Sequence, residues 1–187
     1  MARPYSPTLL GYVLLGLLNQ LPRSGYDVRM EMESSPMGHF SSSPGSIYPA
    51  LQLLKKNGFI DSEVIHRSRL KPREVFHLTE KGKKALSAWL HKRLAVSDLR
   101  DNLSELMLKF RFMEGIASDQ ETLRFLQDFR RKAKTYASIL KSQTRNQAEG
   151  SLHFALSLQR DISMIQMHIE WADQAMTAFE ASRANGP

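Results

Sequence analysis

The stretch SPGSIYPALQLLKKNGFIDSEVIHRSRLKPREVFHLT, residues 43–79, decides the predicted fold of this chain. Its first part has the apolar spacing of an amphipathic helix, and Gly58 supplies a left-handed stop. Two short runs of β type follow, and the turn that joins them is basic. A helix followed by a hairpin with a basic tip is the layout of a winged helix. In that layout the helix enters a DNA groove and the hairpin lies against phosphate.

The helix in this stretch is expected to bury Ile47, Leu51 and Leu54, which lie four and three residues apart on one face. Ser43 and Ser46 are alternative caps for its N-terminus. A proline inside a helix removes a backbone hydrogen bond, so Pro49 fits a first turn better than a later one. This favours the later of the two starts.

Two helices are predicted before this stretch. Residues 8–20 are apolar nearly all round, as a helix buried on most sides should be. Ser24 is a plausible cap for a second helix over residues 25–33. Its inward-facing side chains are predicted to be Tyr26, Met30 and Met32.

The hairpin and a fourth helix complete the first half. Residues 59–66 and 73–78 are the two predicted strands. Thr79 opens a helix whose inward residues are Leu86, Trp89 and Leu90. The predicted fold class is therefore mainly α with a small β-hairpin wing.

The second half has long apolar repeats at alternating spacings of four and three, which are typical of helices that pack along their length. The last helix carries two such stripes, so it needs two partners, and a second subunit is a natural source of one. The core of a bundle within one chain is the alternative. Residues 146–150 are the expected hinge between the two longest helices. The stripe predicted to form a dimer comprises Leu158, Ile162, Ile165, Ile169, Ala172, Met176 and Phe179.

The excess positive charge lies entirely in the first half. Residues 1–93 contain 14 Lys and Arg against 7 Asp and Glu, whereas residues 94–187 contain 12 of each. Such an asymmetry indicates a polyanionic partner for the first half. A basic surface that is merely solvated is the alternative.

Composition argues against several classes of protein. The chain has no cysteine, which excludes disulfides, thiolate catalysis and cysteine-based zinc sites. No phosphate loop, nucleophile elbow, cofactor fingerprint or metal spacing of histidines is present in the sequence, so neither an enzyme, a cofactor nor a metal is expected. No run is long enough to span a bilayer and no signal peptide is evident, so a cytoplasmic location is expected.

The candidate DNA contacts come from the helix start, the outward helix face and the turn. Serine hydroxyls at a helix N-terminus favour phosphate, and glutamine can pair with adenine. Cations in the turn can hold phosphate or enter a minor groove. The predicted contacts are Ser43, Ser46, Tyr48, Pro49, Gln52, Lys55, Lys56, Arg67, Arg69, Lys71 and Arg73. The alternative function is a winged-helix module that binds protein without sequence-specific DNA binding.

Three motifs follow one another in the first half: SGYDV at residues 24–28, GSIYPAL at 45–51 and REVFHLTEKG at 73–82. With these motifs the chain resembles the PadR family of bacterial transcriptional regulators. The second half, with ELMLKF at 105–110, looks like the larger subgroup related to virulence-activator-alpha proteins. Gln52, Leu53 and Glu74 depart from the pattern, since relatives often have basic residues there. This shifts the expected phosphate contacts toward Lys55, Lys56 and the wing tip.

The resemblance implies a winged helix-turn-helix domain, taken as residues 1–95, followed by an α-helical dimerisation domain at 96–187. It also implies a homodimer on an inverted-repeat operator of double-stranded DNA, in most such proteins as a repressor. Some relatives are released by a small aromatic molecule such as a phenolic acid. A ligand pocket at the junction of the halves is placed, from position alone, at Trp89, Phe110 and Phe112.

Overall fold

The computed structural model describes residues 5–34, 43–65, 72–146 and 151–184. The chain divides into two compact units, Met1–Lys92 (unit 1) and Arg93–Pro187 (unit 2). Within the described ranges, no helix is both long enough and apolar enough to cross a membrane.

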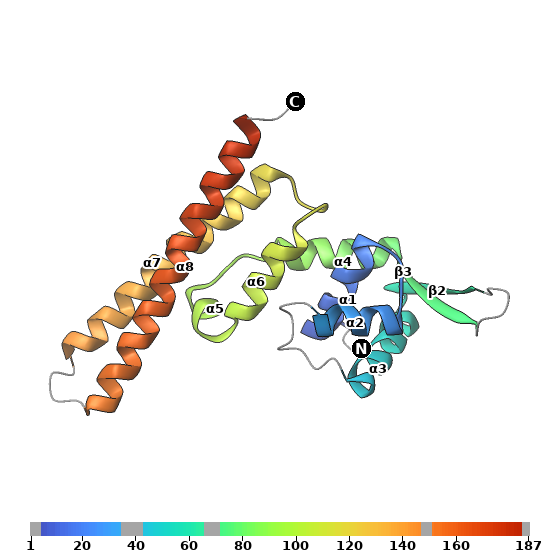
Figure 1. Ribbon diagram of the computed structural model, residues 1–187, viewed down its shortest axis with the longest axis horizontal. Coiled ribbons are helices and arrows are strands. Elements are labelled where there is room, and N and C mark those ends of the chain that lie inside the picture. The colour runs from blue at the N-terminus through green and yellow to red at the C-terminus, as the bar shows by residue number, and fades with distance from the viewer. Residues whose placement is uncertain (1–4, 35–42, 66–71, 147–150, 185–187) are drawn as a thin grey trace. The chain divides into compact units, whose positions relative to one another are not determined.

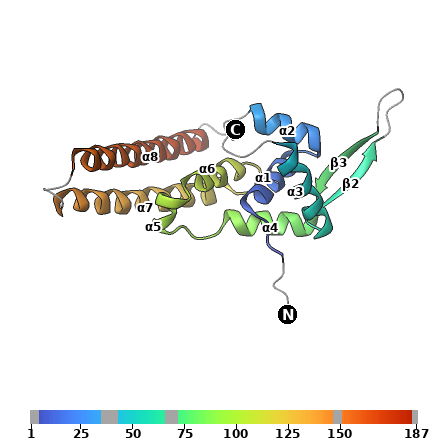
Figure 2. The ribbon, with the colours of Figure 1, turned by 90° about the horizontal axis from the view of Figure 1, so that it is seen from below.

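Unit 1 has the predicted winged helix-turn-helix fold, mainly α with a small β-hairpin wing (Figure 1). In Figure 2 the β2–β3 hairpin extends away from the helices of this unit. In chain order the elements of unit 1 are α1 (Leu9–Gln20), β1 (Arg23–Ser24), α2 (Gly25–Ser34), α3 (Pro44–Lys56), β2 (Ile60–Ile65), β3 (Arg73–Leu78) and α4 (Glu80–Leu90).

Helix α1 is the centre of the core of unit 1. Thr8 caps it, because its side chain accepts a hydrogen bond from the backbone N of Gly11 at 3.2 Å. Val13, Leu14, Leu15 and Leu17 are completely buried, and α1 contacts α3, α4 and β3. The prediction of a helix buried on most sides is confirmed.

The sheet has three antiparallel strands in the order β1-β3-β2. Ile60 pairs with Leu78 and Ile65 with Arg73, which matches the predicted hairpin. The third strand, β1, was not predicted. It has only two residues, Arg23 and Ser24, paired with Phe76 and Val75, and two residues are too few to show an alternating pattern.

The start of α3 differs from the prediction. The helix begins at Pro44, with Ser43 in the N-cap position, so Pro49 lies inside the helix rather than in its first turn. Pro44 is well suited to the first position because it has no N–H to lose and its φ is already helical. Pro49 follows in the next turn. Ile47, Leu51 and Leu54 are fully buried as predicted, and Gly58 takes a φ of 72° just after the helix.

The inward face of α2 was predicted only in part. Met32 is fully buried as expected, together with Val28, but Tyr26 and Met30 are 52% and 41% exposed. Gly25, Val28 and Met32 follow one another at spacings of three and four, and this is the face that packs on the core. Tyr26 and Met30 lie off that face and are exposed.

Gly82 brings the start of α4 against the beginning of the hairpin. Thr79 caps α4 by accepting a hydrogen bond from the backbone N of Gly82, and its own N–H bonds to the carbonyl of Phe59. A Cβ at Gly82 would lie only 2.1 Å from that carbonyl oxygen. This approach requires a glycine.

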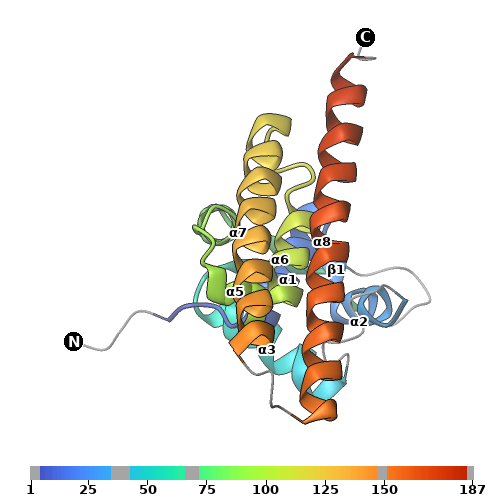
Figure 3. The same ribbon diagram turned by 90° about the vertical axis from the view of Figure 1, so that its left-hand side faces the viewer.

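Unit 2 is entirely helical in its described part and ends in a long antiparallel pair. Its elements are α5 (Val96–Asp101), α6 (Leu103–Phe112), α7 (Asp119–Asn146) and α8 (Leu152–Ala184). Figures 1 and 3 show α7 and α8 side by side along most of their length. An aromatic cluster joins both helices to α6, in which the Phe110 ring meets Trp171 edge-on at 5.0 Å and Trp171 meets Phe129 at 5.7 Å.

The stripe predicted to form a dimer packs inside the chain instead. Leu158, Ile165 and Ile169 are at most 6% exposed, Ala172 is fully buried and Met176 is 8% exposed. Ile162 and Phe179 are half-buried. Because α8 turns this stripe toward α7, the prediction of a dimer seam is corrected to an internal helix–helix seam, the alternative that the periodicity left open.

Candidate nucleic-acid interface

The start of α3 is exposed and carries two hydroxyl groups. Ser43, Pro44 and Gly45 are exposed, and the Ser43 and Ser46 hydroxyl oxygens lie 3.1 Å apart. The partial positive charge of the N-terminus of α3 thus lies at an exposed segment that carries two hydroxyl groups.

The outward face of α3 continues from this start. Tyr48 and Leu53 are 43% and 42% exposed, and Pro49, Gln52 and Lys56 are also exposed. Tyr48, Gln52 and Lys56 follow at intervals of four, so they lie along one side of the helix. The structure brings together a phenol, an amide and an ammonium group, which are suited to phosphate and base edges.

The position of Tyr48 is set by α2. A Cβ at Gly25 would lie 2.5 Å from Cε1 of Tyr48, so part of the ring rests directly on the glycine backbone. The motif residues Gly25 and Tyr48 are twenty-three positions apart in the chain, and their contact fixes the spacing of α2 and α3. A small residue at position 25 holds the phenol on the outward face.

Lys55, a predicted phosphate contact, is engaged within the protein. Its Nζ donates to Ser62 Oγ at 2.5 Å and to Glu74 Oε1 at 3.0 Å, and the Ser62 hydroxyl donates to the same carboxylate oxygen at 2.7 Å. The hydrogen bonds from Ser62 and Lys55 lower the pKa of Glu74 below its ordinary value, against the opposing effect of burial. We call these three residues the Lys55–Ser62–Glu74 triad. It joins α3 to both strands of the hairpin, so Glu74 has two structural partners.

Arg73 is also held by the protein. Its Nη2 lies 2.6 Å from Asp27 Oδ1, and its guanidinium is 5.9 Å from the centre of the Tyr26 ring. The backbone N and the hydroxyl of Ser24 donate to the other oxygen of Asp27. Burial raises the pKa of Asp27, but the bonds from Ser24 and Arg73 outweigh it, and the pKa lies below its ordinary value. The exposed Tyr26 beside Arg73 was missed by the sequence reasoning, which placed it inside.

The remaining predicted wing contacts, Arg67, Arg69 and Lys71, lie outside the described residues. Among the described contacts, Ser43, Ser46, Tyr48, Pro49, Gln52 and Lys56 form one surface at the start and along the outward side of α3. We call this surface the α3 face.

The residues placed in a ligand pocket by position are packed in cores. The Trp89 ring stacks on Tyr12 at 4.9 Å, Phe112 is 2% exposed, and Phe110 belongs to the aromatic cluster of unit 2. A cavity of about 270 Å³ is lined by other residues, from α5, α6, α7 and α8. Its apolar lining is Leu99, Leu103, Met164 and Ile165, and its polar lining is Arg100, Tyr136, Arg160, Asp161 and His168. Burial lowers the pKa of His168, which keeps the imidazole neutral near pH 7.

One stripe of α8 turns away from α7. Leu152 and Leu156 are 70% and 54% exposed, and Met164 and Met167 are 46% and 55% exposed. These four share one side of the helix at spacings close to multiples of 3.6. We call them the outer stripe of α8. An apolar stripe of this length is unusual on a surface that faces only water.

Comparisons with known proteins match both units. The profile of the Transcriptional regulator PadR-like family matches residues 14–88, and the profile described as Virulence activator alpha C-term matches residues 104–180. The Negative transcriptional regulator PadR of Bacillus subtilis is 29% identical over 132 residues, which cover 71% of this chain and 71% of that protein.

Solved structures of similar chains were also found. The crystal structure of Bacillus subtilis PadR in complex with operator DNA is 26% identical, with a TM-score of 0.45, and the match covers 92% of this chain and 99% of that one. The PadR-like regulator from Bacillus cereus is 20% identical, with a TM-score of 0.42, over 95% of this chain and 99% of that one.

Proposed function

We propose that this chain is a transcriptional regulator of the PadR-like family, whose profile matches residues 14–88, and that it binds operator DNA as a homodimer and represses transcription. The observation that carries the proposal is the α3 face, an exposed helix start followed by Tyr48, Gln52 and Lys56 along one side. The name of the Bacillus subtilis relative, a negative regulator, supports repression. The matching family and the relative of this chain are named as regulators rather than enzymes, which supports a function without catalysis.

The α3 face supplies both kinds of contact that sequence-specific binding needs. The hydroxyls and the helix N-terminus at Ser43 and Ser46 suit a phosphate, which positions the helix. Gln52 is exposed six residues beyond Ser46 and suits an adenine edge in the major groove. A dimer that presents two such helices on one side of the duplex would read half-sites about 10 bp apart or a multiple of that.

Binding to duplex DNA with changing salt tests the proposal. Footprinting upstream of the protein's own gene supplies the operator fragment, and a scrambled duplex of equal length is the comparison. We expect Lys56→Ala to weaken binding to both duplexes equally. The slope of the logarithm of affinity against the logarithm of salt concentration should fall in magnitude by about one. Gln52→Ala should instead reduce the preference for the operator, by about 1–3 kcal/mol at one base pair. Lys84→Ala, an exposed lysine on α4, is the matched control and should change neither.

Two outcomes would contradict the proposal. If affinity does not change between low and moderate salt, the chain does not contact phosphate, and the alternative of a protein-binding module is favoured. Equal affinity of the wild-type chain for the operator and the scrambled duplex would exclude sequence-specific binding.

The contribution of the wing needs its own variants, because Arg73 is tied to Asp27 at 2.6 Å. Arg69→Ala with Lys71→Ala removes two wing cations without breaking that ion pair. We expect uniformly weaker binding and a salt slope lower by about two. An unchanged slope would show that these two residues do not contact phosphate.

The outer stripe of α8 is the proposed dimer surface. The internal seam is already covered by α7, whereas Leu152, Leu156 and Met167 are each more than half exposed. A second copy of α8 would bury these side chains at roughly 25 cal/mol per Å² of apolar area. The proposed dimer therefore forms through the outer stripe of α8.

Two pairs of substitutions separate the outer stripe from the seam. Leu156→Asp with Met167→Asp should give folded monomers in analytical ultracentrifugation, with an unchanged helical signal. Ile165→Asp with Ile169→Asp places charges in the buried seam and should unfold unit 2. A folded dimer in the first double variant would exclude the outer stripe.

The cavity between α5, α6, α7 and α8 is the proposed effector site, in place of Trp89, Phe110 and Phe112. Its apolar lining suits an aromatic ring, and Arg160, Tyr136 and His168 can hydrogen-bond a carboxylate or hydroxyl. Phenolic acids are therefore the first compounds to test. We expect p-coumaric acid to weaken operator binding by the wild-type chain, and Tyr136→Phe with His168→Ala to raise the concentration required. Full response in that variant would place the effector elsewhere.

A further inference from the structure

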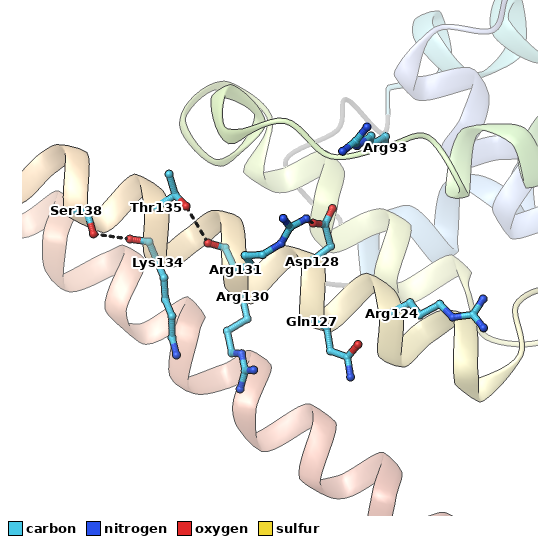
Figure 4. Close-up of a pocket in the computed structure, with 9 residues that line it drawn as sticks. All are labelled: Arg93, Arg124, Gln127, Asp128, Arg130, Arg131, Lys134, Thr135 and Ser138. Atoms are coloured by element: carbon cyan, nitrogen blue, oxygen red, sulfur yellow. Dashed lines mark hydrogen bonds and ion pairs between the residues drawn. The ribbon is translucent and has the colours of Figure 1, made fainter.

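An open basic groove runs along α7 on the surface of unit 2 (Figure 4). We call it the α7 groove. It has a volume of about 930 Å³, and five of its nine lining residues are cations, with one acid, Asp128. The cations are Arg93, Arg124, Arg130, Arg131 and Lys134.

Three of these cations are available to a ligand. Arg130 lies 2.5 Å from Asp173 on α8, and Arg131 is paired with Asp128. Arg93, Arg124 and Lys134 are exposed and have no ion-pair partner in the part of the chain that the structure describes. These three positive charges therefore lie in the groove and are not neutralised by acidic side chains of the described residues.

This concentration does not follow from the composition of unit 2. From residue 93 to the end the chain has 13 Lys and Arg against 12 Asp and Glu. The groove takes five of those cations but only one of those acids, so the rest of the unit has more acids than cations. Cations have been gathered on one side of α7 in a unit that is otherwise acidic, which is typical of a site for an anion.

The lining of the groove narrows the class of anion. The other lining residues, Gln127, Thr135 and Ser138, are polar, and the two hydroxyls donate to backbone carbonyls of α7 (Figure 4). No aromatic or aliphatic residue lines it. Bases of single-stranded nucleic acid need aromatic rings to stack on, and an amphipathic peptide needs apolar pockets. Four arginines and a lysine instead match phosphate, which a guanidinium binds with two parallel hydrogen bonds.

The shape of the groove indicates a long ligand. Arg124 and Ser138 are fourteen residues apart on one helix, which is about 21 Å at 1.5 Å per residue. Small-molecule sites are concave and enclose most of their ligand, whereas this groove is open along its length. A phosphate backbone, with its charges repeated at regular intervals, fits a row of cations of that length.

We propose that the α7 groove is a second contact for duplex DNA, which binds the phosphate backbone without reading sequence. The proposal rests on the proposed function only in that DNA is the partner of the α3 face. It adds affinity for any duplex and leaves the choice of operator to α3.

Removal of the three unpaired cations tests the proposal in the full-length chain. Arg93→Ala, Arg124→Ala and Lys134→Ala are combined in one variant, and Lys132→Ala, Lys141→Ala and Arg183→Ala form the control, with the same loss of charge from unit 2 outside the groove. Affinity for operator and scrambled duplexes is measured by fluorescence anisotropy between 50 and 300 mM salt (roughly the range over which phosphate contacts weaken). Circular dichroism shows that both variants are folded.

The groove variant is expected to bind both duplexes about tenfold more weakly at 100 mM salt, with a salt slope lower by about three. The ratio of operator to scrambled affinity should not change. The control should lose less affinity and keep its slope. A groove variant that matches the control in slope and affinity would overturn the proposal. If the wild-type chain binds duplexes without preferring the operator, the role proposed for the α3 face is wrong. The proposal for the groove would still stand in that case, provided that the groove variant shows the reduced dependence of affinity on salt.

Discussion

Gly25→Ala gives the sharpest test of how α2 positions the α3 face. The added Cβ would lie 2.5 Å from Cε1 of Tyr48, 3.1 Å from Cδ1 and 3.2 Å from Cζ. Carbon atoms prefer separations of about 3.5–4.0 Å. The ring must therefore move by about 1 Å, or α2 and α3 must separate.

The expected cost follows from these contacts. Overpacking of this kind costs about 1–3 kcal/mol of unfolding free energy. All three of the nearest atoms belong to the Tyr48 ring, so Tyr48→Ala removes the closest contacts of the added Cβ. In that background Gly25→Ala should be neutral or stabilising, since alanine exceeds glycine in helix propensity by up to about 1 kcal/mol. The two substitutions should therefore be coupled by about 2 kcal/mol.

Urea denaturation of the wild-type chain, the two single variants and the double variant measures this coupling. Operator binding supplies a second readout, because a displaced Tyr48 ring should lower affinity in Gly25→Ala as Tyr48→Ala does. The double variant should then bind no worse than Tyr48→Ala alone. If Gly25→Ala costs the same free energy in both backgrounds, the ring does not rest on Gly25 and the account of the α3 face is wrong.

Three further predictions concern neighbouring contacts. Gly82→Ala places a Cβ 2.1 Å from the carbonyl oxygen of Phe59, so it should cost more than about 3 kcal/mol in urea denaturation, and no side-chain truncation should restore it; a loss below 1 kcal/mol would refute the contact. The pKa of Glu74 is lower in the folded state than in the unfolded state. The ionised carboxylate therefore stabilises the fold fully at a pH above its unfolded-state pKa, and this stabilisation is lost as the pH falls through its folded-state pKa. Unfolding measured from about pH 6 down to about pH 3 should therefore show a smaller loss of stability in Glu74→Gln than in the wild-type chain, and parallel curves would contradict this. Asp27→Asn weakens the hold on Arg73, so stability should fall while affinity for duplex DNA rises severalfold at low salt; affinity that falls with stability would show that Arg73 does not reach DNA.

The helices and the hairpin were predictable because their signals are local. Ile47, Leu51 and Leu54 lie on one face by spacing alone, and each is fully buried. The start of α3 was placed too late because Pro49 was given more weight than Pro44, which actually occupies the first turn.

The contacts that distinguish the site are not local. Glu74 lies nineteen residues from Lys55, and no pattern in the sequence shows that Ser62 joins them. Sequence periodicity indicated two stripes on α8 but not which of them faces α7, and it did not assign Leu152 and Leu156 to the exposed stripe. Four of the five cations of the α7 groove lie in the half of zero net charge, residues 94–187, so counting charges by halves did not reveal them.

The aromatic contacts give each unit its own optical probe. The chain has two tryptophans, and they are divided between the units. Trp89 is stacked flat on Tyr12 in unit 1, and Trp171 is held edge-on among Phe110 and Phe129 in unit 2. With either one changed to phenylalanine, the emission of the other reports a single unit. The DNA binding proposed for the first unit and the effector binding or assembly proposed for the second can thus be followed separately in the intact chain, without an attached dye.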